Sequence, residues 1–377
     1  MFTFPFISAN LEAMKVTTKT QLAILFLALA CFIGVITALI VNSIVTNQII
    51  SEAQERVKEH LSSARWVYES RIRDIDKVIR WTSIRHVLKE GIKRKNISPI
   101  KNEILGLMSE EELDFITLVD REGRVLFRFH NPRVSGDSLA QDPFIKAALG
   151  KKGVLGTQVL SGDRLLREGE VLARKATITS IPTPKEKPTQ KIEETSGMVL
   201  KSAHPILDFN GEILGVLTGS VLLNRNYEIV DRIKNIVFKD AKYKGKEIGT
   251  ATIFLNDLRI STNVMDKEGN RAIGTRVSAE VYEQVIGKGL PWIKRAFVVD
   301  DWYITAYEPI QDVEKKIVGI LYVGMRESKY AFMKEKLILL FFLFSMSGML
   351  FAFAISFALS WKILKKRNSK SQVPTSK

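Results

Sequence analysis

Residues 205–217 read PILDFNGEILGVL, and residues 309–321, 104 positions later, read PIQDVEKKIVGIL. The two stretches begin with Pro-Ile, place an Asp three residues after the Pro, and repeat Ile, Gly and Leu at matching positions. Each has the pattern of a β-hairpin, because apolar runs flank a short polar turn. A hairpin repeated at this spacing predicts an internal duplication, with copies of about 100 residues that have the size of ordinary domains.

Other elements recur around both hairpins in the same order. In the first copy we expect strands over 115–120 and 124–131, a helix over 143–149 that ends at Gly150, and strands over 198–207 and 212–223. In the second copy we expect strands over 251–255 and 259–264, a helix over 279–286, and strands over 292–299, 302–310 and 316–324. The predicted fold class is α/β (α+β): two tandem antiparallel sheets of five or six strands, each with a helix on one face.

Two uncharged apolar stretches flank this body. Residues 21–43 and 337–361 are each long enough to cross a bilayer as a helix. Lys and Arg collect in the short flanks 1–20 and 362–377, so we expect both termini in the cytoplasm and residues 44–336 on the far side of a bacterial inner membrane. The alternative for the first stretch is a cleaved signal ending before Cys31. We favour an uncleaved anchor, because the apolar run continues to Ile36.

Composition excludes several classes of function. The flanks hold eight of the 56 Lys and Arg and one of the 41 Asp and Glu, so part of the net charge of +15 reflects membrane topology. The remaining charges are interspersed, and we expect no nucleic-acid partner. The one cysteine is Cys31, which rules out disulfides and cysteine-based metal or haem sites in 44–336. We expect no cofactor, no metal and no enzymatic activity, because no catalytic motif occurs.

A long helical stalk is predicted over 44–112. Apolar residues recur every three or four positions from Val45 to Ile79, among charged residues. This stripe has two interpretations: it packs on the body of its own chain, or it forms a dimer seam that transmits displacement into the membrane. A break at residues 96–99 is expected to separate it from a shorter helix that ends near Leu113.

The second copy contains the strings ATIFL at 251–255, RISTNV at 259–264, RAIGT at 271–275, DWYITAYEPI at 301–310 and GILYVG at 319–324. With the long helix and the duplication, these strings resemble the double Cache family, the PAS-like extracytoplasmic sensory domains of bacterial sensor histidine kinases and methyl-accepting chemotaxis receptors. The resemblance covers nearly all of 44–336 and implies a membrane-distal unit, 113–235, and a membrane-proximal unit, 236–336. It also implies capture of a small molecule outside the cell and signalling across the membrane as a dimer.

The resemblance predicts a sensor for chemotaxis or a two-component system, expected here to lack its own output domain because only 16 residues follow Trp361. Signalling would then use a homodimer or a mixed dimer with a full-length receptor or kinase. Two alternatives are a truncated fragment of such a receptor and a structural or interaction protein that binds no ligand.

In the proximal unit we expect a site for a small anionic metabolite, such as an organic or amino acid. Side chains two apart on a strand share a face, which brings together Arg and Tyr hydroxyl groups. A guanidinium binds a carboxylate by paired hydrogen bonds, and aromatic rings exclude water. The candidate residues are Arg259, Arg295, Trp302, Tyr303 and Tyr307. Alternatively, Trp302 and Tyr307 fill the core and the arginines are solvated.

A second candidate anion site in the distal unit comprises Arg128, His130 and Arg174. We expect Arg128 and His130 on one face of the strand over 124–131, and Arg174 on a strand before a loop. His130 could instead cap the strand end. Residues 181–197, rich in Pro, Lys, Thr and Glu, are predicted to form a mobile loop or lid over the distal unit.

Overall fold

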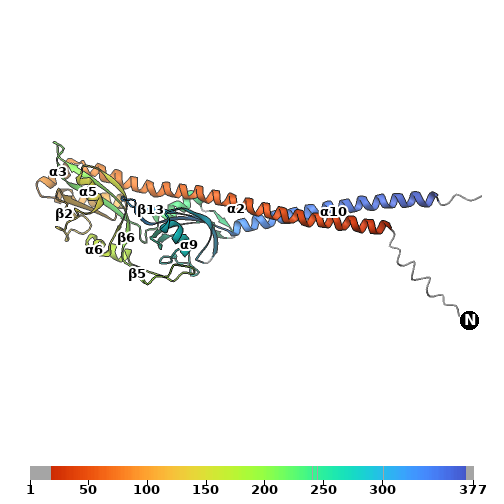
Figure 1. Cartoon of the computed structure of the whole chain (residues 1–377). Coiled ribbons are helices and arrows are strands. Elements are labelled where there is room, and N and C mark those ends of the chain that lie inside the picture. The colour runs from red at the N-terminus through yellow and green to blue at the C-terminus, as the bar shows by residue number, and fades with distance from the viewer. Residues whose placement is uncertain (1–17, 240, 244, 300, 371–377) are drawn as a thin grey trace, which may run out of the picture. The chain divides into compact units, whose positions relative to one another are not determined.

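The computed structural model describes residues 18–370, apart from 240, 244 and 300. These residues form two compact units. The unit that we call the body is Ala53–Glu327 and contains both large sheets (Figure 1). The other unit contains the described residues up to Glu52 and from Ser328 onward. Helix α2 (Thr18–Ser83) contributes to both units, and α10 (Ser328–Lys370) belongs to the second.

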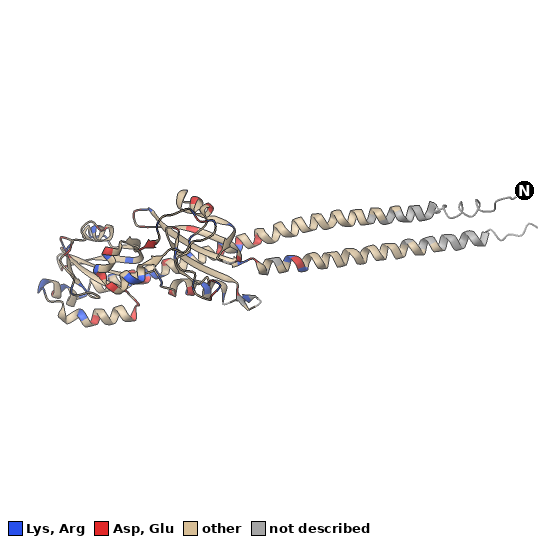
Figure 2. Cartoon of the chain, turned by 90° about the horizontal axis from the view of Figure 1, so that it is seen from below, with Lys and Arg blue, Asp and Glu red and all other residues tan. Residues whose placement is uncertain are grey.

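Two helical segments are long and apolar enough to cross a membrane, as judged by length and composition. They are Cys31–Ser83, with a mean hydropathy of 1.8 in its most apolar part, and Phe332–Ile355, with 2.4. Figure 2 shows the corresponding parts of α2 and α10 as long stretches without charged residues. The helices therefore agree with the two spans predicted from the sequence, while the two-pass topology stays a prediction.

The part of α2 within the body runs along both sheets (Figure 1). Its apolar stripe is buried in the chain itself; the buried members are Ala53, Val57, Leu61, Ala64, Tyr68, Ile72, Ile75 and Ile79. The first of the two interpretations is therefore correct for these residues: the stripe packs on the body of its own chain. Its use as a dimer seam is wrong for this face, because Val57 and Leu61 are at most 4% exposed and cannot also contact a second chain.

The two large sheets have the same strand order, which confirms the predicted duplication. The first sheet is ordered β2-β1-β7-β6-β3 and the second β11-β10-β14-β13-β12. All neighbours are antiparallel. The strands of the first sheet are β1 (Phe115–Asp120), β2 (Val125–Arg128), β3 (Val154–Leu160), β6 (Gly197–Leu207) and β7 (Ile213–Leu222). Those of the second are β10 (Gly249–Leu255), β11 (Leu258–Thr262), β12 (Trp292–Val298), β13 (Asp301–Gln311) and β14 (Ile317–Arg326).

The repeated Asp explains why the two hairpins share one register. Asp208 accepts hydrogen bonds from the backbone N–H groups two and four residues later, at 2.8 and 2.9 Å, and Asp312 does the same at 2.9 Å. This local bonding fixes the turn, and Pro205 and Pro309 then pair with Val216 and Ile320 at equivalent positions. Both hairpins carry a bulge directly after the residue that follows the proline.

Each sheet carries a helix on one face, as predicted. In the first copy α5 (Pro143–Leu149) is capped by the preceding Asp142, whose side chain accepts from the N–H groups of Phe144 and Ile145. In the second copy α9 (Ala279–Tyr282) continues into a π-helical turn, η2 (Glu283–Gly287), and Val281 and Val285 pack into the core of that sheet. Val119 and Val216 of the first sheet share an apolar cluster with α5, and Phe254 and Ile320, at the equivalent positions of the second, share one with α9 and η2. The helices therefore cover the equivalent face of each sheet.

The remaining elements lie before, between and beside the sheets. They are α3 (His86–Lys93), α4 (Ser98–Glu110), α6 (Gly162–Glu168), α7 (Glu170–Ala176), β4 (Ile178–Thr179), β5 (Glu193–Glu194), α8 (Glu228–Ile233), η1 (Lys234–Phe238), β8 (Lys242–Tyr243) and β9 (Lys246–Glu247). The expectation that Arg174 lies on a strand is wrong. It lies in the last turn of α7, a helix that buries Leu172 and Ala176 and places its basic residues at the favourable C-terminal end.

Residues 177–196, which we call the strap, extend from the first copy and contact the second. The Ile181 N–H donates to Gly274 O at 2.8 Å, and Lys185 O accepts from the Ala279 N–H at 2.8 Å. A salt bridge of 3.1 Å joins Lys187 to Glu283. The predicted lid over the distal unit is therefore corrected: these backbone bonds hold the strap against the proximal unit.

Candidate ligand-binding site

The second copy holds a cavity of about 190 Å³. Strands β12 and β13 contribute Trp292, Arg295, Phe297, Trp302 and Tyr307 to its lining. Arg259 comes from β11, residues 275–278 come from the loop before α9, and Thr183–Lys185 come from the strap. Both copies of the duplication therefore supply side chains to one cavity.

Arg259 is the central group of this cavity. Its side chain lies on a strand and is 4% exposed, with the guanidinium carbon 5.2 Å from the centre of the Phe254 ring. Burial lowers the pKa of Arg259, but a guanidinium remains charged at neutral pH. Within the described part of the chain, its buried Nε and Nη1 atoms have no hydrogen-bond partner. An unpaired buried charge is costly, so this site is one that an anion would stabilise.

The other two arginines of the lining are already paired with carboxylates. Arg276 is bound through Nη1 to Asp257, and its Nε donates to Ser180 Oγ of the strap at 3.0 Å. Arg295 binds Glu327 at 2.6 Å and places its guanidinium 3.8 Å from the centre of the Trp302 ring. The charge of Arg259 is therefore distinct, because its neighbours' charges are compensated within the protein.

Aromatic rings form the apolar part of the cavity. Phe297 and Trp302 meet edge to face with ring centres 5.6 Å apart. Trp292 has a buried Nε1 without a hydrogen-bond partner among the described residues, which adds a neutral donor to the unpaired guanidinium. Burial raises the pKa of Tyr307, so its hydroxyl stays protonated and can donate. The arrangement combines unpaired donors with apolar walls, the composition of a small-molecule site.

The structure brings together four of the five predicted residues of the proximal unit. Arg259, Arg295, Trp302 and Tyr307 line the cavity, whereas Tyr303 is buried in the core with its ring 5.2 Å from the Arg326 guanidinium. The alternative interpretation, in which Trp302 and Tyr307 fill the core, holds for Tyr307 and does not hold for Trp302. The sequence reasoning missed Trp292, Arg276 and the strap residues. Trp292 could have been found, because it begins the strand that carries Arg295.

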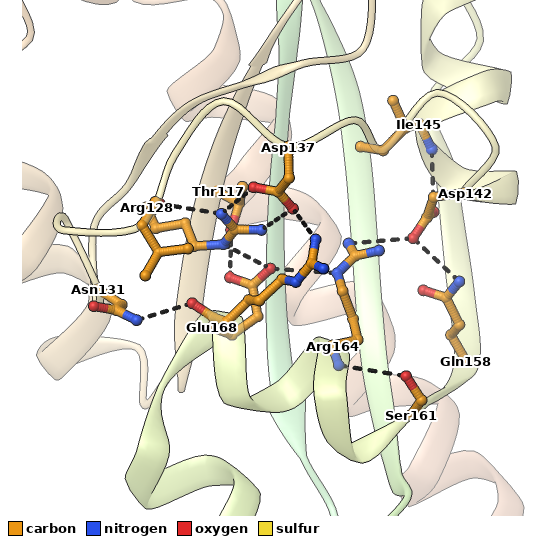
Figure 3. Close-up of polar contacts among 12 residues, drawn as sticks. Thr117, Arg128, Asn131, Asp137, Asp142, Ile145, Gln158, Ser161, Arg164 and Glu168 are labelled. Carbon is orange, nitrogen blue, oxygen red and sulfur yellow. Dashed lines mark hydrogen bonds and ion pairs between the residues drawn. The ribbon is translucent and has the colours of Figure 1, made fainter.

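In the first copy, the charge of Arg128 is compensated by carboxylates of its own chain (Figure 3). The side chain is fully buried and donates to the two oxygens of Asp137 at 2.7 and 2.9 Å and to Val134 O at 3.0 Å. Glu168 lies 3.2 Å away as a second ion pair. The hydrogen bond from Arg128 lowers the pKa of Asp137 to about 2. Two carboxylates therefore occupy the directions from which an anionic ligand would approach.

A second ion network continues from Glu168 to β6. Arg164 lies within 3.5 Å of Glu168 and Asp142, and the buried Lys201 Nζ donates to Asp142 at 2.7 Å and to Gln158 at 2.9 Å. Burial opposes the ionisation of Asp142, but the charge and hydrogen bond of Lys201 overcome it and lower the pKa of Asp142. The cations of this region are compensated, unlike Arg259.

The other predicted residues of the first copy are separated from this network. His130 is exposed beyond the end of β2 and packs against Gly169, and Arg174 is exposed on α7. The structure therefore does not assemble Arg128, His130 and Arg174 into one anion site. Among the described residues, no group of three or more His, Cys, Asp or Glu side chains is placed to hold a metal ion.

Comparison with known proteins gives a family match for the second copy. Residues 221–337 match the family described as single Cache domain 3. No curated protein matches. The matched segment begins in β7, includes the whole second sheet and ends within α10. The predicted Cache resemblance is therefore confirmed over this part of the chain.

Solved structures with similar folds include three sensory domains. The periplasmic domain of Vibrio cholerae LuxQ is 12% identical with a TM-score of 0.40, and the match covers 72% of this chain and 99% of that one. The sensor domain of the V. cholerae histidine kinase DctB is 11% identical, with a TM-score of 0.38 and coverage of 74% and 98%. The ligand-binding domain of the Campylobacter jejuni chemoreceptor Tlp3, solved with L-valine, is 9% identical, with a TM-score of 0.40 and coverage of 78% and 98%. The family match therefore applies to residues 221–337, which are similar to single Cache domain 3.

Proposed function

We propose that this protein is a membrane-anchored sensor that binds a small anionic solute in the proximal unit. The observation that carries the proposal is Arg259, a buried guanidinium with unpaired Nε and Nη1 atoms that lines a cavity of about 190 Å³. A binding role rather than a catalytic one is proposed, because the lining offers a charge, donors and aromatic walls but no nucleophile with an adjacent base.

Membrane anchoring is supported by the two apolar segments and by the basic residues that flank them in the sequence. In this proposal both termini are cytoplasmic and the body lies in the periplasm or outside the cell. The helix α2 extends from the apolar segment into the body, where Tyr68 and Arg65 bind residues of β3 and β13. Ligand-dependent movement of the sheets would reach the membrane through this helix. The chain would signal as a homodimer or in a mixed dimer with a partner receptor.

The proposal is tested by calorimetric titration of the full chain in detergent with small carboxylic acids. Arg259→Gln should weaken binding at least tenfold, since the charge-assisted bonds to the ligand are lost. Arg174→Gln is the matched control, because it removes an exposed arginine outside the cavity. Equal affinities for the wild-type protein and a folded Arg259→Gln variant would contradict the proposal.

A further inference from the structure

We infer that the cavity selects a monoanion with an apolar body, for which a short-chain monocarboxylate is the model ligand, over dicarboxylates and free amino acids. The inference rests on the proposed function and specifies its ligand class. It follows from three properties of the described lining: its net charge, its lack of a free buried carboxylate for an ammonium group, and its apolar walls.

The lining carries one uncompensated positive charge. Its four cations are Lys185, Arg259, Arg276 and Arg295. Asp257 neutralises Arg276 and Glu327 neutralises Arg295. Lys185 and Glu280 are both exposed members of the lining, and their opposite charges cancel in the sum. The net positive charge that remains is that of Arg259, which matches a ligand with one negative charge.

Apart from Arg259, the described lining offers a second carboxylate on the ligand no free buried cation, since Lys185 is exposed to water. Arg276 is held by Asp257 and by Ser180 of the strap, so binding a second carboxylate would require it to leave partners that are themselves buried or partly buried. The side chain of Arg295 is exposed and pairs with Glu327, so water competes for its hydrogen bonds. A dianion would therefore bury an unpaired charge, which strongly disfavours binding.

Among the described residues, an ammonium group would also lack a free buried carboxylate. Asp257, a buried carboxylate two residues before Arg259 in the sequence, is paired with Arg276, and the carboxylate of Glu280 is exposed. A zwitterionic amino acid could bind Arg259 through its carboxylate, but its ammonium group would have no buried carboxylate as a partner.

The remaining surface suits a small apolar group. Trp292, Phe297 and Trp302 contribute rings, and Val277 and Val298 contribute buried aliphatic groups. An engineered cavity of about 150 Å³ in another protein binds benzene, so a cavity of this size accepts a ligand of roughly six to nine non-hydrogen atoms. Buried apolar area then adds affinity that a fully polar anion of the same charge would not gain.

The test compares three acids with the same four-carbon chain: butyrate, succinate and 2-aminobutyrate. Calorimetric titration of the full chain in detergent, at fixed pH and ionic strength, should give a dissociation constant for butyrate at least tenfold below those of the other two. Equal or tighter binding of succinate or 2-aminobutyrate, abolished by Arg259→Gln, would overturn the inference and leave the proposed function standing. If no small carboxylate binds, the proposed function fails as well.

A variant that frees a second cation provides an independent readout. Asp257→Asn removes the partner of Arg276 and should narrow the preference for butyrate over succinate at least fivefold. Asp231→Asn is the matched control, because it removes the carboxylate partner of Arg271, which is not among the lining residues, and it should change the ratio by less than twofold. An unchanged ratio in a folded Asp257→Asn variant would overturn the inference. If this variant does not fold, the wild-type ratio of the three acids decides the question.

Discussion

The hydroxyl of Tyr68 lies 2.8 Å from Oγ1 of Thr157, and both side chains are buried. This contact ties α2 to β3, and Thr157 also forms a parallel bridge with Asp312 of the second hairpin. One residue of the first sheet therefore contacts both the long helix and the second copy. We expect Tyr68→Phe to lower the free energy of unfolding by about 1 to 2 kcal/mol, because the buried Thr157 hydroxyl loses its partner. Urea unfolding of the full chain, followed by tryptophan fluorescence, measures this free energy for both proteins. Equal values for the wild-type protein and the variant would show that water replaces the hydrogen bond.

Arg259→Met should stabilise the ligand-free protein while removing anion binding. The substitution replaces an unpaired buried charge by an apolar side chain of similar length, so the desolvation cost of the charge disappears. We expect a higher melting temperature without ligand and a loss of the shift that a carboxylate produces in the wild-type protein. A lower melting temperature in the absence of ligand would mean that Arg259 stabilises the fold.

Arg128→Met should have the opposite effect. This arginine is also fully buried, but it is paired with Asp137 and Glu168, so its removal leaves two carboxylates without their cation. We expect a loss of about 3 to 5 kcal/mol in the free energy of unfolding. Comparing the melting temperatures of the Arg128→Met and Arg259→Met variants isolates the effect of pairing, since the residue type and the burial are matched.

Acid stability should depend on Asp137. Its pKa falls from 3.8 to about 2 on folding, chiefly because Arg128 donates to the carboxylate. A group with a depressed pKa in the folded state contributes stability that is complete above its unfolded pKa and is lost as the pH falls through the folded value. Between pH 5 and pH 2, the melting temperature of the wild-type protein should therefore fall more steeply than that of Asp137→Asn. Parallel curves would contradict the role of this pair.

Leu61→Ala should destabilise the body rather than an interface. Leu61 is 4% exposed within its own chain, and truncation of a buried leucine costs about 2 to 5 kcal/mol. The loss should be independent of protein concentration, because the side chain packs inside one chain. A melting temperature that rises with concentration in the wild-type protein and not in the variant would instead restore the stripe as a dimer seam.

The parts of the fold that could be predicted are those with local causes. Asp208 and Asp312 bond to their own turns, so the hairpins and their duplication are visible in the sequence. The glycines of the repeat, Gly215 and Gly319, have equivalent reasons: a Cβ atom at either would overlap a backbone oxygen of the adjacent strand, Val119 O or Phe254 O. Local hydrogen bonds and close strand approach thus leave a residue pattern that reappears 104 positions later.

The pairing of the arginines could not be predicted, because it depends on contacts between distant residues. Arg128 and Arg259 lie on equivalent strands, β2 and β11, of the two sheets. Arg128 pairs with Glu168, 40 residues later in the chain, whereas Arg259 has no carboxylate partner among the described residues. The two short strands β4 and β5 likewise pair through two residues each, too few to give an alternating pattern. Arg259, Arg295, Trp302 and Tyr307 on strands were therefore found, whereas Trp292 and the residues brought in by the strap were missed.

Because of the strap, the candidate site is built from two regions of the chain, and neither copy of the duplication contains both regions. Thr183 Oγ1 accepts from the backbone N–H of Arg276 at 3.0 Å, and Thr183–Lys185 line the cavity, but all three precede the segment similar to a single Cache domain. A chimeric receptor that received 221–337 alone would carry the arginine without this part of its wall. Exchange of ligand specificity between such proteins would therefore require grafting residues 177–196 together with the second sheet.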